Sequence, residues 1–300
     1  MRRIGVFMAW PSDDPVTQAN AAELLQALQE LGWTVGRNVQ IEWRWCVADA
    51  ARARKDAEDL VALAPDVIVA FSGATLAALV RTGHAVPIVF FGVVDPVGAG
   101  YVTSLARPGG HVTGFASFDI SASVKWLQLL KEIAPSVTRV LVFRAAATGG
   151  ASQFGAIQGV APAMGVELRP VDSSNRDEIE RAVGELARNP NGGLIVTGSA
   201  GAAVNRELIV ALAVKHRLPA VYPDRRFIES GGLICYGAVR VGQVHPIAGY
   251  VDRILIGEKP GDLPVQAPTK YETVLNLKTA KALGLDVPAT VLARADQVIE

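Results

Sequence analysis

The acidic residue Asp95 stands near the start of a long Gly/Pro-rich passage that directly follows a strand-like apolar run, Val86–Phe91. If that run is a strand of a parallel sheet, Asp95 lies just beyond its carboxyl end, where open α/β sheets bind their ligands. A long loop at this place is more often functional than idle. Asp95 is therefore a candidate to meet a cation or an ammonium group. The alternative is that the passage only turns the chain around Pro96, Gly98 and Gly100.

A second candidate site is the short polar connection Ser72–Thr75, which leads from an apolar run into a helix-like segment. Free backbone N–H groups at a helix start, aided by a hydroxyl, form an anion site that suits a ligand carboxylate. The alternative is that Ser72 or Thr75 only caps the helix, and both roles can hold together. Ser199 occupies the equivalent point in the second half of the chain.

A carboxylate site together with a lone acid describes the zwitterion of an amino acid better than it describes a sugar. Asp224 is the second acidic candidate, although it can instead cap a short helix at Arg225–Glu229. Trp10 and Tyr222 are predicted to stack on a ligand, because aromatic rings give flat apolar walls with a polar handle. The predicted ligand-binding set is Trp10, Ser12, Ser72, Gly73, Ala74, Thr75, Asp95, Ser199, Tyr222, Asp224 and Tyr236.

Several signatures of catalysis and cofactor binding are missing from the sequence. The first strand is followed by Trp-Pro-Ser and not by G-x-G-x-x-G, and neither a phosphate-binding G-x-x-x-x-G-K-[ST] loop nor a G-x-S-x-G elbow occurs. The four histidines are scattered without ligand spacing, and Cys46 and Cys235 lie far apart in apolar contexts that favour buried free thiols over a disulfide. We therefore expect no catalytic residues, no metal and no cofactor.

The elements that must position these residues alternate regularly. Fully apolar strand-like runs between helix-like segments indicate parallel sheets that are covered on both faces. In the first half the strands are Arg3–Ala9, Val39–Trp45, Val67–Phe71 and Pro87–Phe91, and the helices are Val16–Leu31, Ala50–Leu63 and Thr75–Thr82. In the second half the strands are Arg139–Phe143, Val166–Val171, Leu194–Thr197, Ala220–Tyr222 and Leu233–Tyr236, with helices between them. The pattern predicts an α/β fold of two doubly wound lobes.

Composition is consistent with two folded lobes. Of the 300 residues, 50% are hydrophobic and 19% are charged, which excludes a mainly disordered chain. The formal net charge is zero and no Lys/Arg run occurs, so nucleic acid is not an expected partner. No apolar stretch reaches the 18 residues needed to span a membrane. The stretch Ile4–Trp10 is too short for a signal peptide and lacks a small-residue cleavage site.

Four long segments carry a resemblance to a known family. They are Val86–Gly114, LGWTVGRNVQIEWRW (31–45), KHRLPAVYPDRRFIESGGLICYG (215–237) and LPVQAPTKYETVLNLKTAKALGLDVP (263–288). In this order they resemble the ABC-transporter substrate-binding proteins that include bacterial tryptophan- and tyrosine-uptake binding proteins. The resemblance implies a type I periplasmic-binding-protein-like fold with a multi-crossing hinge. Residues 1–117 and 241–266 are expected in the first lobe and 118–240 in the second, and residues 267–300 pack near the hinge in a lobe left open.

The same resemblance implies a function. We expect an extracytoplasmic solute-binding protein of an ABC importer, which binds an aromatic or otherwise apolar amino acid between its lobes by hinge closure. A membrane permease is the implied partner, a monomer is the expected state, and a periplasmic or membrane-anchored location implies a leader that this chain does not include. The alternatives are a racemase-like enzyme and a ligand-sensing module of the same fold. A sensor that acts on DNA would need a DNA-binding head before Arg3.

Overall fold

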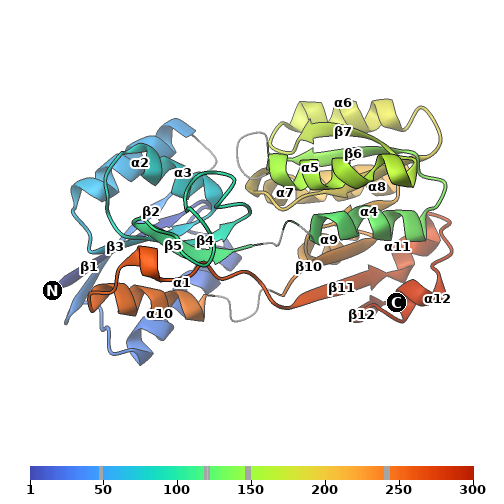
Figure 1. The fold of residues 1–300 in the computed structure, drawn as a ribbon. Helices are drawn as coiled ribbons and strands as arrows, with labels where there is room; N and C mark the ends of the chain where they lie inside the picture. Colours follow the sequence, from blue (N-terminus) through green and yellow to red (C-terminus); the bar gives the residue numbers. More distant parts are fainter. Residues whose placement is uncertain (47–49, 118–119, 121, 146–149, 240–243) are drawn as a thin grey trace. The chain divides into compact units, whose positions relative to one another are not determined.

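The computed structural model describes the chain except for residues 47–49, 118–119, 121, 146–149 and 240–243 (Figure 1). The chain divides into two compact units. Unit 1 comprises Met1–Ser117 and Arg240–Ala267, and unit 2 comprises Phe118–Val239 and Pro268–Glu300. The chain thus passes from one unit to the other three times, and the last 33 residues belong to unit 2.

Unit 1 is built on a five-stranded parallel sheet with the order β2-β1-β3-β4-β5. Its strands are β1 (Arg2–Met8), β2 (Val39–Trp45), β3 (Val67–Phe71), β4 (Ile88–Val93) and β5 (Val112–Ala116). Its helices are α1 (Pro15–Glu30), α2 (Ala50–Ala62), α3 (Gly73–Arg81) and α10 (His245–Leu255), with a 3₁₀ turn at Pro260–Asp262. Helices α1 and α10 cover one face of the sheet and α2 and α3 cover the other.

The strand β3 shows why this sequence forms a central strand. Val67, Val69 and Phe71 belong to the core with α1 and α10, whereas Ile68 and Ala70 belong to the core with α2 and α3. Successive side chains of a strand point to opposite faces, so a strand that is buried on both faces must be apolar throughout. All five residues are at most 1% exposed.

Unit 2 is built on a seven-stranded sheet with the order β12-β11-β10-β9-β8-β6-β7. Its strands are β6 (Arg139–Arg144), β7 (Glu167–Asp172), β8 (Gly192–Val196), β9 (Ala220–Tyr222), β10 (Ile234–Ala238), β11 (Tyr271–Asn276) and β12 (Gln297–Ile299). Its helices are α4 (Ala122–Ile133), α5 (Gly150–Val160), α6 (Arg176–Leu186), α7 (Ala200–Val204), α8 (Arg206–Lys215), α9 (Arg225–Glu229), α11 (Leu277–Ala282) and α12 (Ala289–Leu292), with a 3₁₀ turn at Pro162–Met164. All strand pairs are parallel except β10 with β11.

The predicted fold class is confirmed, since both units are α/β and their strands pair in parallel apart from β10 with β11. Two edge strands, β5 and β12, were not predicted. One of the helices expected between the strands of the second half covers Ser152–Met164 in the sequence pattern. In the structure it is interrupted, because α5 ends at Val160 and a 3₁₀ turn begins at Pro162. Proline has no N–H to donate to the preceding turn, so the α-helix stops before it.

Both cysteines are buried thiols outside any disulfide, as predicted. Cys235 lies in β10 within the core of unit 2, and its burial raises the pKa of the thiol to about 12. A thiol with such a pKa is not a nucleophile near neutral pH. Cys235 therefore acts as a small core residue.

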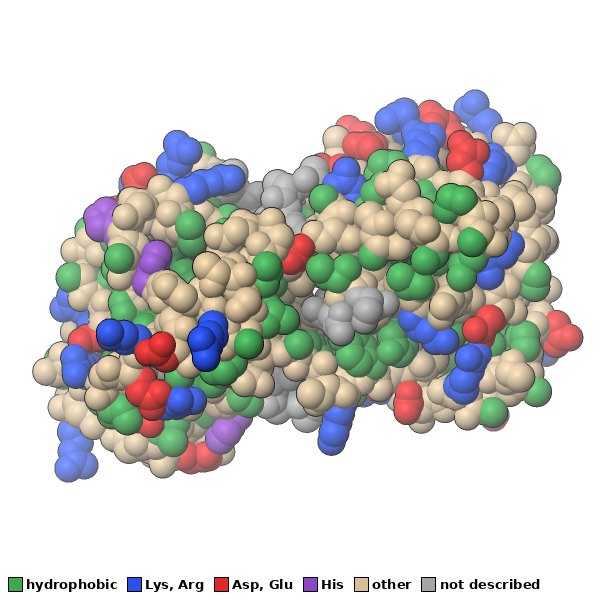
Figure 2. All heavy atoms as spheres, viewed as in Figure 1, with side chains coloured by type: hydrophobic (Ala, Val, Ile, Leu, Met, Phe, Trp, Pro, Cys, Tyr) green, Lys and Arg blue, Asp and Glu red, His purple; other side chains and the backbone are tan. Residues whose placement is uncertain are grey.

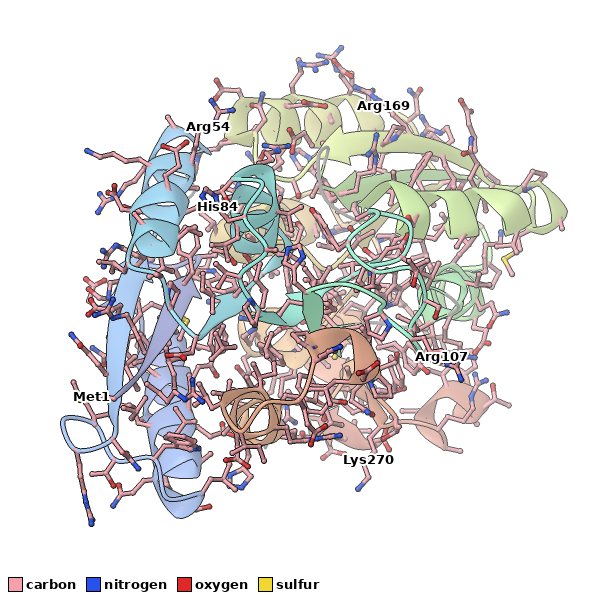
Figure 3. The ribbon with its side chains drawn as sticks, turned by 60° about the vertical axis from the view of Figure 1, so that its left-hand side comes forward. Met1, Arg54, His84, Arg107, Arg169 and Lys270 are labelled. Atoms are coloured by element: carbon pink, nitrogen blue, oxygen red, sulfur yellow. The ribbon has the colours of Figure 1, made fainter. Side chains whose placement is uncertain are left out.

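The charged side chains form exposed pairs with little single-sign clustering on the face shown in Figure 2. Arg169, which is labelled in Figure 3, pairs with Glu185 at 2.8 Å, and Arg253 pairs with Glu258 at 2.7 Å. Exposed pairs of this kind contribute little to stability, because water and salt screen the two charges. Among the helices that the structure describes, none is long and apolar enough to cross a membrane.

Gly114 allows a close approach between β4 and β5. Its φ is +150°, and a Cβ at this position would lie 2.1 Å from the carbonyl oxygen of Phe90. We expect Gly114→Ala to destabilise unit 1 by about 2–4 kcal/mol, since it combines backbone strain with overpacking. Gly184 in α6 is the control, because a Cβ there meets nothing within 4 Å. Gly184→Ala should stabilise by about 0.5–1 kcal/mol.

Thermal unfolding followed by circular dichroism measures both variants. The transition midpoint should fall for Gly114→Ala and rise slightly for Gly184→Ala. Equal midpoints for the two variants would contradict the close packing of β5 on β4.

Candidate ligand-binding site

The predicted residues of unit 1 follow three neighbouring parallel strands, β1, β3 and β4. The carboxyl ends of parallel strands lie at the same edge of the sheet, and the segments that follow them are brought together there. Trp10 and Ser12 follow β1, Ser72–Thr75 follow β3, and Asp95 follows β4. We call this edge of the sheet the carboxyl edge of unit 1.

The connection from β3 to α3 forms a well-defined helix cap. The Ser72 hydroxyl accepts a hydrogen bond from the Thr75 backbone N–H at 3.2 Å, and the Thr75 hydroxyl donates to the Ser72 carbonyl at 3.1 Å. Thr75 is 0% exposed and Ser72 is 8% exposed. The N–H groups of Gly73 and Ala74 belong to the first helical turn and have no partner within the helix. The capping role is present, and two donors remain for an anion.

The backbone of Ser72 is strained. Its φ of 150° and ψ of 166° lie in a region that is essentially reserved for glycine. Such a conformation costs about 1–3 kcal/mol and persists only where the surrounding structure enforces it. Strained residues of this kind are concentrated at functional sites. The strain favours a functional role for the β3–α3 connection.

Asp95 is 8% exposed and lies at the start of a tight turn. Its carboxylate accepts a hydrogen bond from the Gly98 N–H at 2.8 Å, and its carbonyl accepts one from Ala99 at 3.1 Å. This is the turn-forming role that the sequence left open as the alternative. A Cβ at Gly98 would lie 2.1 Å from the carboxylate, so glycine is required for this approach.

Trp10 and Ser12 differ in their surroundings. Trp10 is half-buried and packs against the core shared by α1, α10 and the sheet. Ser12 is exposed, and its carbonyl accepts a hydrogen bond from the Gln18 side chain at 3.2 Å. Trp10 is thus held at the carboxyl edge by its packing against the core and is only partly buried.

In unit 2 the predicted residues come from β8, β9 and β10, which are also neighbours in the sheet and parallel. Ser199 follows β8 and caps α7, since its hydroxyl accepts from the Ala202 N–H at 3.1 Å and lies 2.9 Å from the Ser173 hydroxyl. Tyr236 is half-buried within β10, and its ring stacks on Tyr271 with centroids 5.3 Å apart. We call this edge of the second sheet the carboxyl edge of unit 2.

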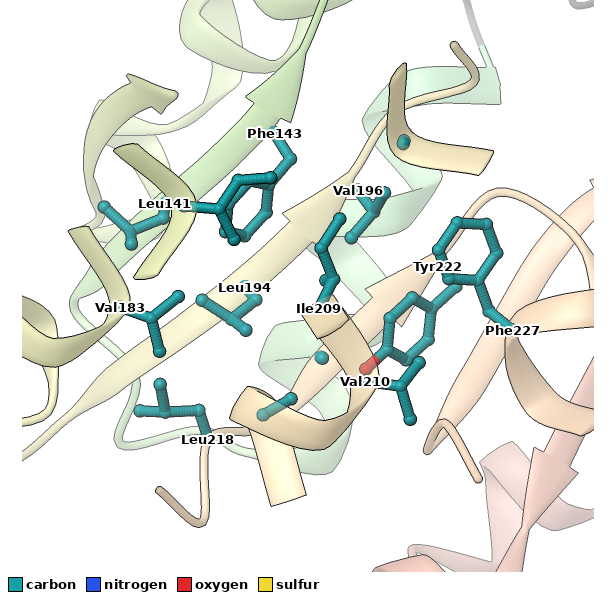
Figure 4. Close-up of a cluster of buried hydrophobic side chains, with 14 of the residues drawn as sticks. Leu141, Phe143, Val183, Leu194, Val196, Ile209, Val210, Leu218, Tyr222 and Phe227 are labelled. Atoms are coloured by element: carbon teal, nitrogen blue, oxygen red, sulfur yellow. The ribbon is translucent and has the colours of Figure 1, made fainter. Parts of the chain in front are cut away.

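The prediction that Tyr222 stacks on a ligand does not agree with its place in the structure. The side chain is 1% exposed, lies in the core between the sheet and α8, and stacks on Phe227 at 5.1 Å (Figure 4). Burial raises the pKa of its phenol above the ordinary value. Alternation along β9 explains this position, because Ala220 and Tyr222 face the same core. Tyr222 is a core residue here.

Asp224 performs the capping role that the sequence offered as its alternative. Its carboxylate accepts from the Arg226 backbone N–H at 3.1 Å and from the Arg226 guanidinium at 3.0 and 2.7 Å. Asp224 is 7% exposed, and the guanidinium offsets its charge. The structure therefore favours Asp224 as the N-cap of α9 over a partner for a ligand ammonium.

Two buried polar residues at the carboxyl edge of unit 2 were not predicted from the sequence. Ser123 in α4 and Gln153 in α5 are each 0% exposed, and their side-chain polar atoms have no hydrogen-bond partner. No motif marks either residue, since isolated Ser and Gln in amphipathic helices are common. Their burial without partners becomes visible only in the folded chain. Among the described residues no group of His, Cys, Asp and Glu side chains could hold a metal ion.

Comparison with known proteins extends the assignment from a fold to a family. The Streptococcus ABC domain solved in complex with L-Trp shares 22% identity over 99% of both chains, with a TM-score of 0.86. A conserved domain protein from Vibrio cholerae shares 27% identity over 99% of both chains, with a TM-score of 0.88. A tyrosine-binding protein from Clostridioides difficile is 25% identical over 268 residues, which are 87% of this chain and 75% of that protein.

Two parallel-sheet units of this kind define a type I periplasmic-binding-protein fold. The family model for ABC transporter substrate binding proteins matches residues 6–299, and this chain belongs to that family. It is a binding protein and not an enzyme.

The strain at Ser72 predicts that two substitutions at this position change the stability of the protein in opposite directions. Ser72→Ala removes the capping hydroxyl and should cost about 1 kcal/mol. Ser72→Gly gives up little capping and relieves about 1–3 kcal/mol of strain, so this variant should be at least as stable as the wild type. Thermal unfolding of the unliganded protein measures both. If glycine destabilises the protein as much as alanine does, the backbone at Ser72 is not strained.

Proposed function

We propose that the protein is an extracytoplasmic solute-binding protein of an ABC importer whose ligand is an amino acid, with an aromatic or other apolar side chain preferred. The observation that carries this proposal is the family match over residues 6–299. It is supported by relatives that are a tyrosine-binding protein and a domain solved with L-Trp. The carboxyl edge of unit 1 supplies the chemistry that such a ligand needs.

The zwitterion of the ligand accounts for two features of unit 1. The open N–H groups of Gly73 and Ala74 point out of a helix N-terminus, where the helix dipole favours a carboxylate. Asp95 is a buried acidic group on a neighbouring connection, since it follows β4 and β4 neighbours β3. A carboxylate attracts the α-ammonium group of an amino acid. Both groups lie directly after central strands, and hydrogen bonds to the following residues fix their positions.

The side chain of the ligand needs an apolar surface. Trp10 in unit 1 and Tyr236 in unit 2 are both half-buried at their carboxyl edges, whereas Tyr222 is enclosed in the core. Aromatic contacts of this kind contribute about 0.5–1.5 kcal/mol beyond the burial of area. Trp10 and Tyr236 are therefore the stacking residues in this proposal.

Transport requires that the loaded protein differ from the empty one. We propose that the ligand engages residues of both units and that binding favours a closed state about the three chain passages near Ser117, Val239 and Ala267. The closed state would dock on a membrane permease. Family membership supports an extracytoplasmic location. Solution scattering with saturating ligand should then give a smaller radius of gyration than scattering without ligand.

The anion site at α3 is tested by a pair of threonines at the two ends of the helix. Thr75 lies at its start, and Thr82 caps its end by donating to the Leu79 carbonyl at 2.7 Å. Thr75→Ala removes the hydroxyl that bonds to the Ser72 carbonyl and so loosens the turn that presents the Gly73 and Ala74 N–H groups. It should weaken binding of L-phenylalanine by about 1.5–3 kcal/mol, the range for a hydrogen bond to a charged group. Thr82→Ala should leave the affinity unchanged. Titration calorimetry on both variants measures the difference, and equal affinities would place the carboxylate elsewhere.

Preference for an aromatic ligand is tested by competition. Phenylalanine should displace a bound fluorescent amino-acid probe several-fold better than leucine does, given the aromatic contribution of about 0.5–1.5 kcal/mol. If leucine or valine displaces the probe better, the aromatic preference is wrong while the transport role stands. Incubation with an amino-acid panel followed by chiral chromatography should reveal no turnover, and turnover would contradict the whole proposal.

A further inference from the structure

Arg144 is an unusual cation at the carboxyl edge of unit 2. It is the last residue of β6 and is half-buried. Its guanidinium lies over the ring of Phe154 at 5.6 Å and makes one long hydrogen bond of 3.4 Å to the Ala145 carbonyl. The charged residues described in this structure include none that forms an ion pair with it. A half-buried guanidinium without a carboxylate is available to an anion from outside the chain.

Gln153 lies in the first turns of α5 and is 0% exposed. Neither its Oε1 nor its Nε2 has a hydrogen-bond partner. A buried polar group without a partner is destabilising, and each case in a folded protein requires an explanation. A ligand that supplies the missing partner is such an explanation.

The packing of α5 directs Gln153 toward Arg144. Gly150, Gln153 and Ile157 are the buried residues of α5, and their spacing places them on one helix face. A Cβ at Gly150 would lie 2.4 Å from the Ala145 carbonyl oxygen and 3.1 Å from the Cβ of Arg144. The first turn of α5 therefore rests on the end of β6. Side chains of a helix lean toward its N-terminus, so the Gln153 amide lies toward this same end.

A third unpartnered polar group comes from a neighbouring helix. Helix α4 packs against α5. Ser123 stands in the first turn of α4, is 0% exposed, and has a hydroxyl with no hydrogen-bond partner. Among the described residues, Ser123 and Gln153 thus lack hydrogen-bond partners, and Arg144 lacks an ion-pair partner.

We propose that Arg144 and Gln153 are the residues with which unit 2 binds the carboxylate of the ligand, with Ser123 as a further hydrogen-bonding group. The proposal rests on the proposed function, because it assumes a ligand of the amino-acid class. The guanidinium fork matches the two oxygens of a carboxylate, and the Gln153 amide donates a further hydrogen bond. A carboxylate accepts about four hydrogen bonds, so binding by Arg144 and Gln153 leaves acceptor capacity for further donors.

The first test compares probes with and without a carboxylate. L-phenylalanine and L-phenylalaninamide are titrated against the wild type, Arg144→Met and Arg144→Lys. Arg144→Met should weaken L-phenylalanine binding roughly tenfold to a hundredfold, because a hydrogen-bonded charge partner is lost, and should reduce the preference for the acid over the amide. Arg144→Lys should retain part of the affinity. Arg139→Met is the control, since Arg139 begins the same strand and donates to the Pro190 carbonyl.

An unchanged preference for acid over amide in Arg144→Met overturns the assignment while the proposed function stands. If the wild type binds no amino acid, the proposed function fails instead. In that case 3-phenylpropionate, which keeps the carboxylate and lacks the amino group, still tests Arg144. Equal binding of this probe to wild type and Arg144→Met, or no binding to either, overturns the proposal.

The second test asks whether the Gln153 amide binds the ligand or is buried without a role in binding. Gln153→Met keeps the length of the side chain and removes the unpartnered polar atoms, so it should raise the thermal midpoint of the unliganded protein. It should also weaken L-phenylalanine binding at least threefold. The control is Gln158→Met, which changes an exposed glutamine of the same helix and should alter neither quantity. A stabilised Gln153→Met variant with wild-type affinity would overturn the role of Gln153.

Discussion

Burial of both faces of each parallel sheet is the constraint on which the other features of this protein depend. In unit 1 the central strand β3 is at most 1% exposed at every residue, and helices cover it from both sides. A polar side chain in the middle of such a strand would be buried without a partner, at a cost of about 1–3 kcal/mol. Polar groups are therefore confined to the strand ends. The connections after β1, β3 and β4 carry Trp10, Ser72 and Asp95 for this reason.

Residues at the strand ends must also fill the core and cap the helices. A residue that stabilises the fold in this way is not available to bind a ligand. In unit 2 the end of β9 is used for the fold, because Tyr222 fills the core beside Phe227 and Asp224 caps α9 while pairing with Arg226. The end of β6 is used differently. Among the residues that the structure describes, Arg144 contacts the Phe154 ring and makes one long hydrogen bond, and the Gln153 amide has no hydrogen-bond partner. Arg144 is thus a stronger ligand candidate than Tyr222 or Asp224, because the fold uses the latter two for the core and for a helix cap.

This competition between folding and binding roles explains what could be predicted from the sequence. The central strands and the fold class followed from continuous apolar runs such as Val67–Phe71, since only doubly covered parallel strands need them. β5 was not recognised because Gly114 interrupts its pattern, and β12 has only three residues. Tyr222 and Tyr236 look equivalent in the sequence, as each stands at or near a strand end. One is enclosed by α8 and α9 and the other is half-buried, and that difference depends on tertiary packing.

Two locally destabilising features set the carboxyl edges apart from the remainder of the fold. Ser72 holds a backbone conformation that is essentially reserved for glycine, and Gln153 keeps an amide buried without partners. Each costs about 1–3 kcal/mol in a protein whose total stability is about 5–15 kcal/mol. Neither arrangement is needed for the sheets or their helices. Both become favourable when a ligand supplies hydrogen-bonding groups, because donors held in place before binding lose less conformational entropy on association. A site that is unsatisfied when empty also rejects solutes that lack the matching polar groups, since such solutes leave its buried groups unpaired.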